Sequence, residues 1–239
     1  LTVEVSAISP LNASMTFTAT SDTSDVIVSL DSTTLTAVPA QDWNGSSLIT
    51  VIVTDENELS DTTDFTLTVN AVNDAPVLLS IGDQELSEDG TLNILLSSFD
   101  VEGDVLEYSV EGGANISASL SGSELVFNPA QDFYGSESFT VTVNDGALEN
   151  SETFALTVNA VNDAPVLASV SDVSFDEDGS GSTSLFADDV DGDDLVFSIT
   201  SGTDISASLT GSDVSFSAPD NYNGSEEFSV SVTDGNLAD

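Results

Sequence analysis

Apolar residues recur at every second position in short runs along this chain, and turns rich in Gly, Ser, Asn and Asp separate the runs. Such alternation is typical of a β-strand that buries one face, because successive side chains point to opposite sides of a strand. No run shows a helical period. Strands are expected near residues 1–5, 15–19, 26–30, 49–53, 65–69, 77–81, 92–96, 106–110, 116–120, 125–127, 139–143 and 154–158.

The heptapeptide Asn-Ala-Val-Asn-Asp-Ala-Pro stands at residues 70–76 and again at 159–165, 89 positions later. Recurrence at a domain-sized spacing indicates tandem modules, and the Asn, Asp and Pro residues mark the heptapeptide as a joint between them. We therefore expect three repeats. Residues 1–70 form an N-terminally incomplete repeat, 71–159 a complete one, and 160–239 a repeat that lacks its last strand, as in an internal piece of a longer polypeptide.

The complete repeat is expected to contain about seven short strands. Seven alternating strands joined by turns, with no helix, indicate an antiparallel β-sandwich of the immunoglobulin-like, Greek-key type. The fold class is therefore all-β, with sandwiches arranged in tandem. An aromatic residue stands at one equivalent position in each repeat (Trp43, Phe133 and Tyr222), where it is expected to close one end of a core, although exposed aromatic residues could instead bind sugars.

The charge of the chain is one-sided, with 43 acidic residues, no Lys, Arg or His, and a net charge of −43. Nucleic acid and anionic membranes are therefore poor partners, because proteins bind both through basic groups. The chain has no Cys, and so neither disulfides nor thiolate metal sites are expected. Any cations that offset this charge must come from solution.

Many of the acidic residues lie in the loops at the two ends of each expected sandwich. One end carries the loop 100–104 and Asp145, and the other carries Glu88, Asp89, Asp132 and the joint. When one repeat follows another, the loops of the second repeat that lie beside the joint meet the loops of the third repeat at its near end. The residues expected to converge there are Glu88, Asp132, Asn162, Asp163, Asp189, Asp191, Asp193 and Asp234.

Like charges brought together in this way require a cation, and Ca²⁺ accepts six to eight oxygen ligands in flexible geometry. Mg²⁺ fits less well because it prefers a tight octahedron with several waters. Two other interpretations remain open: a solvated, salt-adapted acidic surface, and paired carboxylates that hydrolyse a glycoside. A plain acidic surface does not require the same loop acids every 89 residues, and no His, Lys or Arg is present to assist acid–base chemistry.

These motifs resemble the cadherin-like tandem repeats of large bacterial surface proteins, including adhesins of the RTX type. The resemblance covers nearly the whole chain. It depends on the Val-Asn-Asp-Ala-Pro joint, Glu-Asp-Gly at 88–90 and 177–179, Asp-Val-Asp-Gly-Asp at 189–193, Asp-Phe-Tyr-Gly at 132–135, and Asp-Gly at 145 and 234.

The resemblance implies Ca²⁺ bound between successive repeats. The second repeat would supply Glu88 and Asp132, and the linker would supply Asn162 and Asp163. The third repeat would supply Asp189, Asp191, Asp193 and Asp234. At the first joint it implies a matching set: Asp42, Asn73, Asp74, Asp100, Glu102, Asp104 and Asp145. Residues 9–12 replace the acidic loop and no Glu-Asp-Gly opens the first repeat, so we expect no ion at the upper end of that repeat and one ligand fewer at the first joint.

The function we expect is that of a non-enzymatic, extracellular stalk at the cell surface. Its Ca²⁺-stiffened repeats, packed against neighbouring repeats, would hold the distal domain of an adhesin away from the cell in cell adhesion or a biofilm. That distal domain, outside this sequence, would bind a glycan or another cell-surface ligand. The alternative is the repeating body of an exported filament in which strands are exchanged between subunits.

Overall fold

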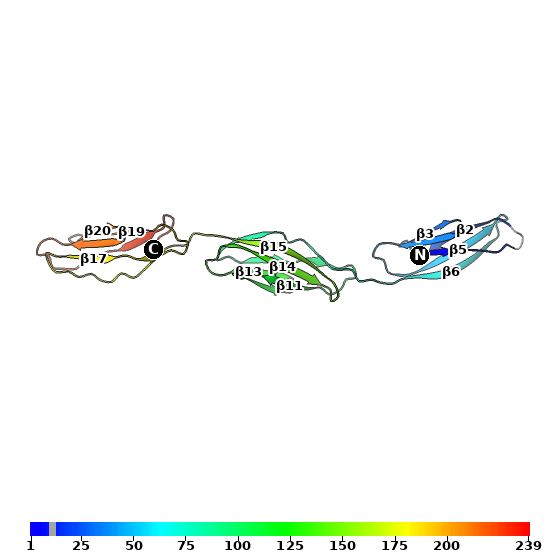
Figure 1. Ribbon diagram of the computed structural model, residues 1–239, viewed down its shortest axis with the longest axis horizontal. Helices are drawn as coiled ribbons and strands as arrows, with labels where there is room; N and C mark the ends of the chain where they lie inside the picture. Colours follow the sequence, from blue (N-terminus) through cyan, green and yellow to red (C-terminus); the bar gives the residue numbers. More distant parts are fainter. Residues whose placement is uncertain (10–12) are drawn as a thin grey trace. The chain divides into compact units, whose positions relative to one another are not determined.

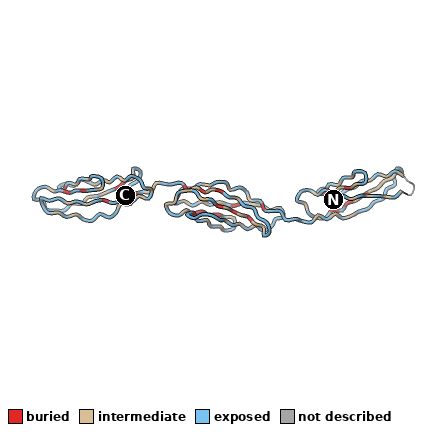
Figure 2. The backbone as a smooth tube through the Cα atoms, viewed as in Figure 1, coloured by how far each residue is buried: buried red, intermediate tan, exposed pale blue. Residues whose placement is uncertain are grey.

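The computed structural model describes residues 1–9 and 13–239, and every regular element in those ranges is a β-strand (Figure 1). The prediction for the loop at residues 9–12 therefore lies largely outside the described residues. Buried and exposed positions alternate along the strands, as the period of two in the sequence predicts (Figure 2). The all-β, immunoglobulin-like fold class is confirmed.

The chain divides into two compact units, of which the first comprises Leu1–Leu79, Ser97–Ser109 and Thr142–Ser151. Its sheets have the strand orders β1-β4-β3, β2-β5-β6 and β10-β7. The strands are β1 (Thr2–Glu4), β2 (Met15–Ser21), β3 (Val26–Asp31), β4 (Thr34–Pro39), β5 (Gly45–Asp55), β6 (Ser60–Val69), β7 (Val77–Leu78) and β10 (Ser98–Phe99).

The second unit comprises Ser80–Leu96, Val110–Val141 and Glu152–Asp239. Its sheets have the orders β12-β13-β9, β17-β21-β20, β16-β18 and β19-β22. The strands are β9 (Leu92–Leu95), β12 (Ile116–Ser121), β13 (Glu124–Pro129), β16 (Val166–Leu167), β17 (Ser180–Ser184), β18 (Ala187–Asp188), β19 (Val196–Ile199), β20 (Ser206–Thr210), β21 (Asp213–Ser217) and β22 (Val230–Thr233).

A four-stranded sheet of order β11-β14-β15-β8 contains residues of both units. Its strands are β8 (Gln84–Ser87), β11 (Glu107–Gly112), β14 (Gly135–Asn144) and β15 (Glu149–Asn159). Between residues 77 and 159 there are nine strands, β7 to β15, instead of about seven. The expected first strand is shorter than predicted, and β8 forms because it pairs with β15. That pairing is parallel, whereas only antiparallel neighbours were predicted.

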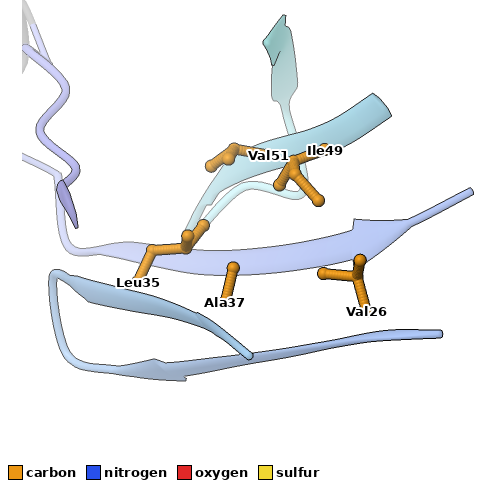
Figure 3. Close-up of a cluster of buried hydrophobic side chains, with 5 residues drawn as sticks. All are labelled: Val26, Leu35, Ala37, Ile49 and Val51. Carbon is orange, nitrogen blue, oxygen red and sulfur yellow. The ribbon is translucent and has the colours of Figure 1, made fainter. Parts of the chain in front are cut away.

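The cores of the sandwiches are formed by the inward-facing residues of the alternating strands. In the first unit, Val26, Leu35, Ala37, Ile49 and Val51 come from β3, β4 and β5 and face one another (Figure 3). In the second unit, the fully buried rings of Phe127 and Phe139 lie edge to face with their centroids 4.7 Å apart. Such packing stabilises each sandwich by burying apolar surface.

The turn before β5 and its counterpart before β14 share an unusual backbone conformation. Asp42 and Asp132 have positive φ angles of 59° and 55°, which Asp tolerates better than most residues. The ring of Trp43 lies over Gly45, where an added Cβ would come within 3.1 Å of it. Trp43 also packs half-buried against the core, as predicted. The same turn positions the carboxylate of Asp132.

Candidate metal centre

The joint at residues 159–165 is fixed by hydrogen bonds to the loops that follow it in the chain. The Asn162 side chain donates through Nδ2 to Asp234 Oδ2 at 2.7 Å, and the Asp163 backbone N–H donates to Asp191 Oδ2 at 2.8 Å. The joint is therefore connected to the β18–β19 loop and to the end of β22. Sequence reasoning predicted that these three segments converge.

The β18–β19 loop is ordered by one of its own carboxylates. Asp189 Oδ1 accepts hydrogen bonds from the backbone N–H groups of Asp191, Gly192 and Asp193 at 3.0, 3.0 and 3.2 Å. This is the local arrangement by which Asp stabilises turns. It occupies Oδ1 fully and leaves Oδ2 free to point elsewhere.

The β8–β9 loop contributes the most buried acid of the site. Glu88 is only 4% exposed, and its Oε1 accepts a short hydrogen bond from the backbone N–H of Val161. The backbone N–H of Glu88 donates in turn to the Asn159 carbonyl at 3.0 Å. The end of β15 is thus tied to the loop that carries Glu88 and Asp89.

Carboxylates from these segments form three groups, and within each group one oxygen per residue lies within 4.8 Å of the others. The groups are Glu88 with Asp163 and Asp191, Asp89 with Asp132 and Asp163, and Asp189 with Asp191 and Asp193. Because Asp163 and Asp191 each belong to two groups, the three groups are continuous. Seven acids therefore form one connected cluster.

Two oxygens of this centre are buried without a hydrogen-bond partner, Asp163 Oδ2 and Asp189 Oδ2. A buried carboxylate oxygen that accepts no hydrogen bond is costly. Desolvation raises the pKa of Asp163, and the charges of Asp132, Asp89, Asp191 and Glu88 raise it further. The pKa of Asp193 is raised by desolvation and then by Asp189 and Asp191. Both shifts indicate negative charge that nothing in the protein neutralises.

Asp234 belongs to the centre in a different way from these carboxylates. Its pKa is lowered, first by the hydrogen bond from the Asn162 side chain and then by the backbone N–H groups of Leu237 and Asn236. The residue therefore remains ionised and holds Asn162 in place. It is not a member of the three carboxylate groups.

The first joint repeats this hydrogen-bond framework 89 positions earlier. Asn73 Nδ2 donates to Asp145 Oδ2 at 2.8 Å, and the Asp74 backbone N–H donates to Glu102 Oε2 at 3.2 Å. Asp100 Oδ1 accepts from the N–H groups of Glu102 and Asp104, and its Oδ2 is buried without a partner.

Within the described ranges, however, the first joint forms no group of three close carboxylates. Most of its acids are exposed, and no hydrogen bond connects Asp42 to the other predicted residues there. The predicted set at this joint is therefore only partly brought together.

Sequence reasoning missed Asp89 as a member of the centre, although it noted the Glu-Asp-Gly motif that contains it. The positive φ angle of 59° at Asp89 turns the backbone so that adjacent acids join two different groups. A residue pair in a tight turn can contribute two ligands, which the motif alone did not indicate.

The centre fits a hard divalent cation. The side-chain atoms available to coordinate an ion are carboxylate and amide oxygens, which Ca²⁺ and Mg²⁺ prefer as ligands. Shared carboxylates can bridge neighbouring ions, and the two partnerless oxygens are the ligands that a cation would occupy.

The described residues include no helix long and apolar enough to cross a membrane.

Comparison with known proteins gave three kinds of relative. A family model described as bacterial Ig domain matches residues 73–159 and 162–238. A protein named Chitinase A from Pseudoalteromonas piscicida is 33% identical over 130 residues, which cover 53% of this chain and only 16% of that relative.

Two protocadherin structures have a similar fold, each with a TM-score of 0.54. PcdhgB3 EC1-4 is 14% identical and is matched over 100% of this chain and 68% of its own. Protocadherin Gamma B2 extracellular cadherin domains 1-5 is 18% identical, over 94% of this chain and 50% of its own. At these identities the likeness shows the fold alone, which is that of tandem immunoglobulin-like or cadherin-like sandwiches.

Proposed function

Because the chain belongs to the bacterial Ig-domain family, we propose that it is a non-enzymatic spacer of an extracellular surface adhesin, stiffened by Ca²⁺ at its joints. In this proposal the spacer projects a distal binding domain from the cell. The support comes from the joint at residues 159–165, where seven carboxylates gather and no basic side chain is available to neutralise them.

The observation that carries the proposal is the pair of partnerless buried oxygens, Asp163 Oδ2 and Asp189 Oδ2. They belong to different segments, the joint and the β18–β19 loop. When bound, Ca²⁺ supplies the positive charge and the coordination bonds that these oxygens lack. Glu88, Asp89, Asp132, Asp163, Asp189, Asp191 and Asp193 would hold it, and Asn162 and Asp234 would position the joint.

The stiffening follows from linkage. An ion that binds the ordered joint and not the slack one stabilises the ordered state by about 2.7 kcal/mol when its free concentration is a hundred times the dissociation constant. Removing the ion leaves carboxylates that repel one another, so the joint loosens. The first joint, with Asn73, Asp74, Asp100, Glu102, Asp104, Asp145 and Asp42, is proposed as a weaker site of the same kind.

The likeness to a protein named Chitinase A favours a second arrangement, in which these sandwiches accompany a catalytic region elsewhere in a longer polypeptide. The present residues would then still act as a spacer. The absence of Lys, Arg and His supports a non-catalytic role for this stretch in both arrangements.

The test compares the protein in excess chelator with the protein in millimolar Ca²⁺. We expect Ca²⁺ to raise the melting temperature by several degrees and to increase the maximum dimension in small-angle X-ray scattering. Asp163→Asn should remove most of both responses, because Asp163 belongs to two carboxylate groups. Asp64→Asn, the same change at an exposed position in β6, should retain both.

Equal Ca²⁺ responses in wild type and Asp163→Asn would contradict binding at this joint. A rise in melting temperature without any change in dimension would support binding but not stiffening. In the chelated state, Asp163→Asn should be at least as stable as wild type, because it removes a repelled charge.

A further inference from the structure

The side chain of Asn162 connects the metal centre to a residue outside its carboxylate groups, Asn236. Asn162 Nδ2 donates hydrogen bonds to Asp234 Oδ2 at 2.7 Å and to the backbone carbonyl of Asp163 at 2.9 Å. Asn162 Oδ1 accepts a third hydrogen bond from Asn236 Nδ2 at 3.3 Å. Both N–H groups and the oxygen of the Asn162 amide are therefore engaged.

Among the described residues, the first joint makes only the first two of these hydrogen bonds. Asn73 Nδ2 donates to Asp145 Oδ2 at 2.8 Å and to the backbone carbonyl of Asp74 at 3.2 Å. The residue at the position of Asn236 is Ala147, whose side chain cannot donate a hydrogen bond. The third hydrogen bond is therefore particular to the second joint.

The turns that carry Asn236 and Ala147 share the same local backbone hydrogen bond. Asp234 Oδ1 accepts from the backbone N–H of Asn236 at 2.6 Å, and Asp145 Oδ1 accepts from the backbone N–H of Ala147 at 2.7 Å. The two joints thus differ at this position by a side-chain amide on an equivalent turn.

The Asn162 amide helps to fix the backbone of Asp163, the acid that belongs to two of the three carboxylate groups. It holds the carbonyl of Asp163, while the backbone N–H of Asp163 donates to Asp191 Oδ2 at 2.8 Å. Rotation of the Asn162 amide about χ2, a soft torsion in Asn, would break the hydrogen bond to that carbonyl. The hydrogen bond from Asn236 opposes this rotation.

We propose that Asn236 is a positioning residue of the metal centre, which acts through Asn162 on Asp163 and raises the affinity of the centre for Ca²⁺. The inference rests on the proposed function, because the ion is the Ca²⁺ proposed there. Its physical basis is preorganisation: the apparent affinity is proportional to the fraction of free protein whose ligands are already in place. Asn236 increases that fraction without contacting the ion.

The main test is Asn236→Ala, which places in the third repeat the residue that the second repeat has as Ala147. Asn236 is exposed, so the melting temperature in excess chelator should stay close to that of wild type. Calcium binding to the full chain is followed by NMR through the backbone amide of Asp163, which distinguishes this joint from the first. We expect the dissociation constant to rise about 3- to 10-fold, which corresponds to the loss of one neutral hydrogen bond.

Asn236→Asp separates hydrogen bonding from charge. An ionised Asp has nearly the shape of Asn, but it cannot donate a hydrogen bond to Asn162 Oδ1, and it adds a negative charge. If residue 236 acted through charge, this variant would bind Ca²⁺ more tightly than wild type. Because we assign its effect to hydrogen-bond donation, we expect the dissociation constant to remain above that of wild type.

A second measurement tests the contact without any ion. In excess chelator, the side-chain amide protons of Asn162 should exchange with solvent several-fold faster in Asn236→Ala than in wild type, because the amide is held less firmly. The control for both measurements is Asn57→Ala, an equal change at an exposed turn of the first repeat, where the backbone N–H of Asn57 donates to Asp55 Oδ1 at 2.8 Å. It should alter neither the exchange at Asn162 nor the affinity measured at Asp163.

The outcomes distinguish this inference from the proposed function. No response of Asp163 to Ca²⁺ in wild type would overturn both. A clear response with equal dissociation constants in wild type and Asn236→Ala would overturn the positioning role alone, as would tighter binding by Asn236→Asp. A large loss of stability of Asn236→Ala in chelator would also overturn it, because Asn236 would then support the fold. Weaker binding by both variants, with unchanged melting in chelator, supports the positioning role.

Discussion

A carboxylate plays one of two opposite roles in this protein, according to whether backbone N–H groups or other carboxylates surround it. The pKa of Glu226 is lowered by the backbone N–H of Asp204 above all, and also by those of Ile205 and Thr203, which together outweigh desolvation. Desolvation and four neighbouring acids raise the pKa of Asp163 instead. The first kind of acid stabilises the fold when ionised, and the second destabilises it unless a cation is present.

Glu152 provides a test of the first role. Backbone N–H groups of Gly82 and Ile81 lower its pKa below the ordinary value of 4.5. Its contribution to stability is therefore complete above that value and is lost as the pH falls through the lowered pKa. We expect Glu152→Gln to reduce the free energy of unfolding at pH 7 by about 1–2 kcal/mol, and to flatten the fall in stability below pH 4.5.

Urea denaturation at pH 7 and pH 3 measures both effects. The control is Glu149→Gln, which removes the same charge from an exposed position on the same strand and should change stability little. A pH dependence that is identical in wild type and Glu152→Gln would show that this carboxylate does not contribute as described.

At the residue scale, the sequence predicted the acids that repeat in loops. It did not predict the acids whose carboxylates accept hydrogen bonds from backbone N–H groups. Asp163, Asp189 and Asp191 could be predicted because they lie in motifs of several acids. Glu152 lies within β15 and Glu226 lies in the segment before β22, and the role of each depends on backbone N–H groups that come from distant turns. Such partners are set by the tertiary fold, so no local pattern indicates them.

At the scale of elements, the turn that leads into β5 combines a strained backbone with an aromatic side chain. Gly45 has a φ of 146°, and a Cβ added there would lie only 3.1 Å from the Trp43 ring. Gly135 has a φ of 144° and lies under the Phe133 ring in the same way. The Asp-aromatic-x-Gly motif in the sequence is therefore a packing unit, which argues against a sugar-binding role for Trp43.

Gly45→Ala should destabilise the first unit by about 1–3 kcal/mol, because the added Cβ combines an unfavourable φ with a contact at 3.1 Å. Trp43 is the only Trp in the chain, so its fluorescence reports the change directly. We expect the emission maximum to move to longer wavelength as the ring is displaced.

Gly122→Ala is the matched variant, since Gly122 also has a positive φ but an open space around its Cβ position. It should leave the Trp43 spectrum unchanged. If both variants leave the spectrum unchanged, the ring does not pack on Gly45 as described.

The longer strands were predictable because each buries one face, whereas β8 and β10 were not. Both are at most four residues long, and they pair with strands from other parts of the chain. β8 in particular depends on its parallel neighbour β15, some 70 residues later. Short runs with a remote partner show too little alternation to be recognised locally.

At the scale of the whole molecule, the net charge of −43 causes exposed carboxylates to repel one another. Salt shortens the Debye length from about 10 Å at 0.1 M to about 3 Å at 1 M, and this screening reduces repulsion among exposed carboxylates. In excess chelator we therefore expect the melting temperature to rise by several degrees between 0.1 and 1 M NaCl.

Tetramethylammonium chloride separates screening from binding of Na⁺, because its large cation cannot enter close carboxylate groups. Equal effects of the two salts indicate screening. A melting temperature that does not change with either salt would mean that self-repulsion contributes little to the stability of this chain.

Asp163 and Asp191 each serve two of the three carboxylate groups at the second joint. Neighbouring ions would not bind there independently. The first ion would orient a shared carboxylate and would thereby change the affinity for the second ion. A calcium titration would then depart from a single-site hyperbola. Loss of Asp163 would disturb two coordination positions at once, whereas loss of Asp132, which serves one group, would disturb a single position.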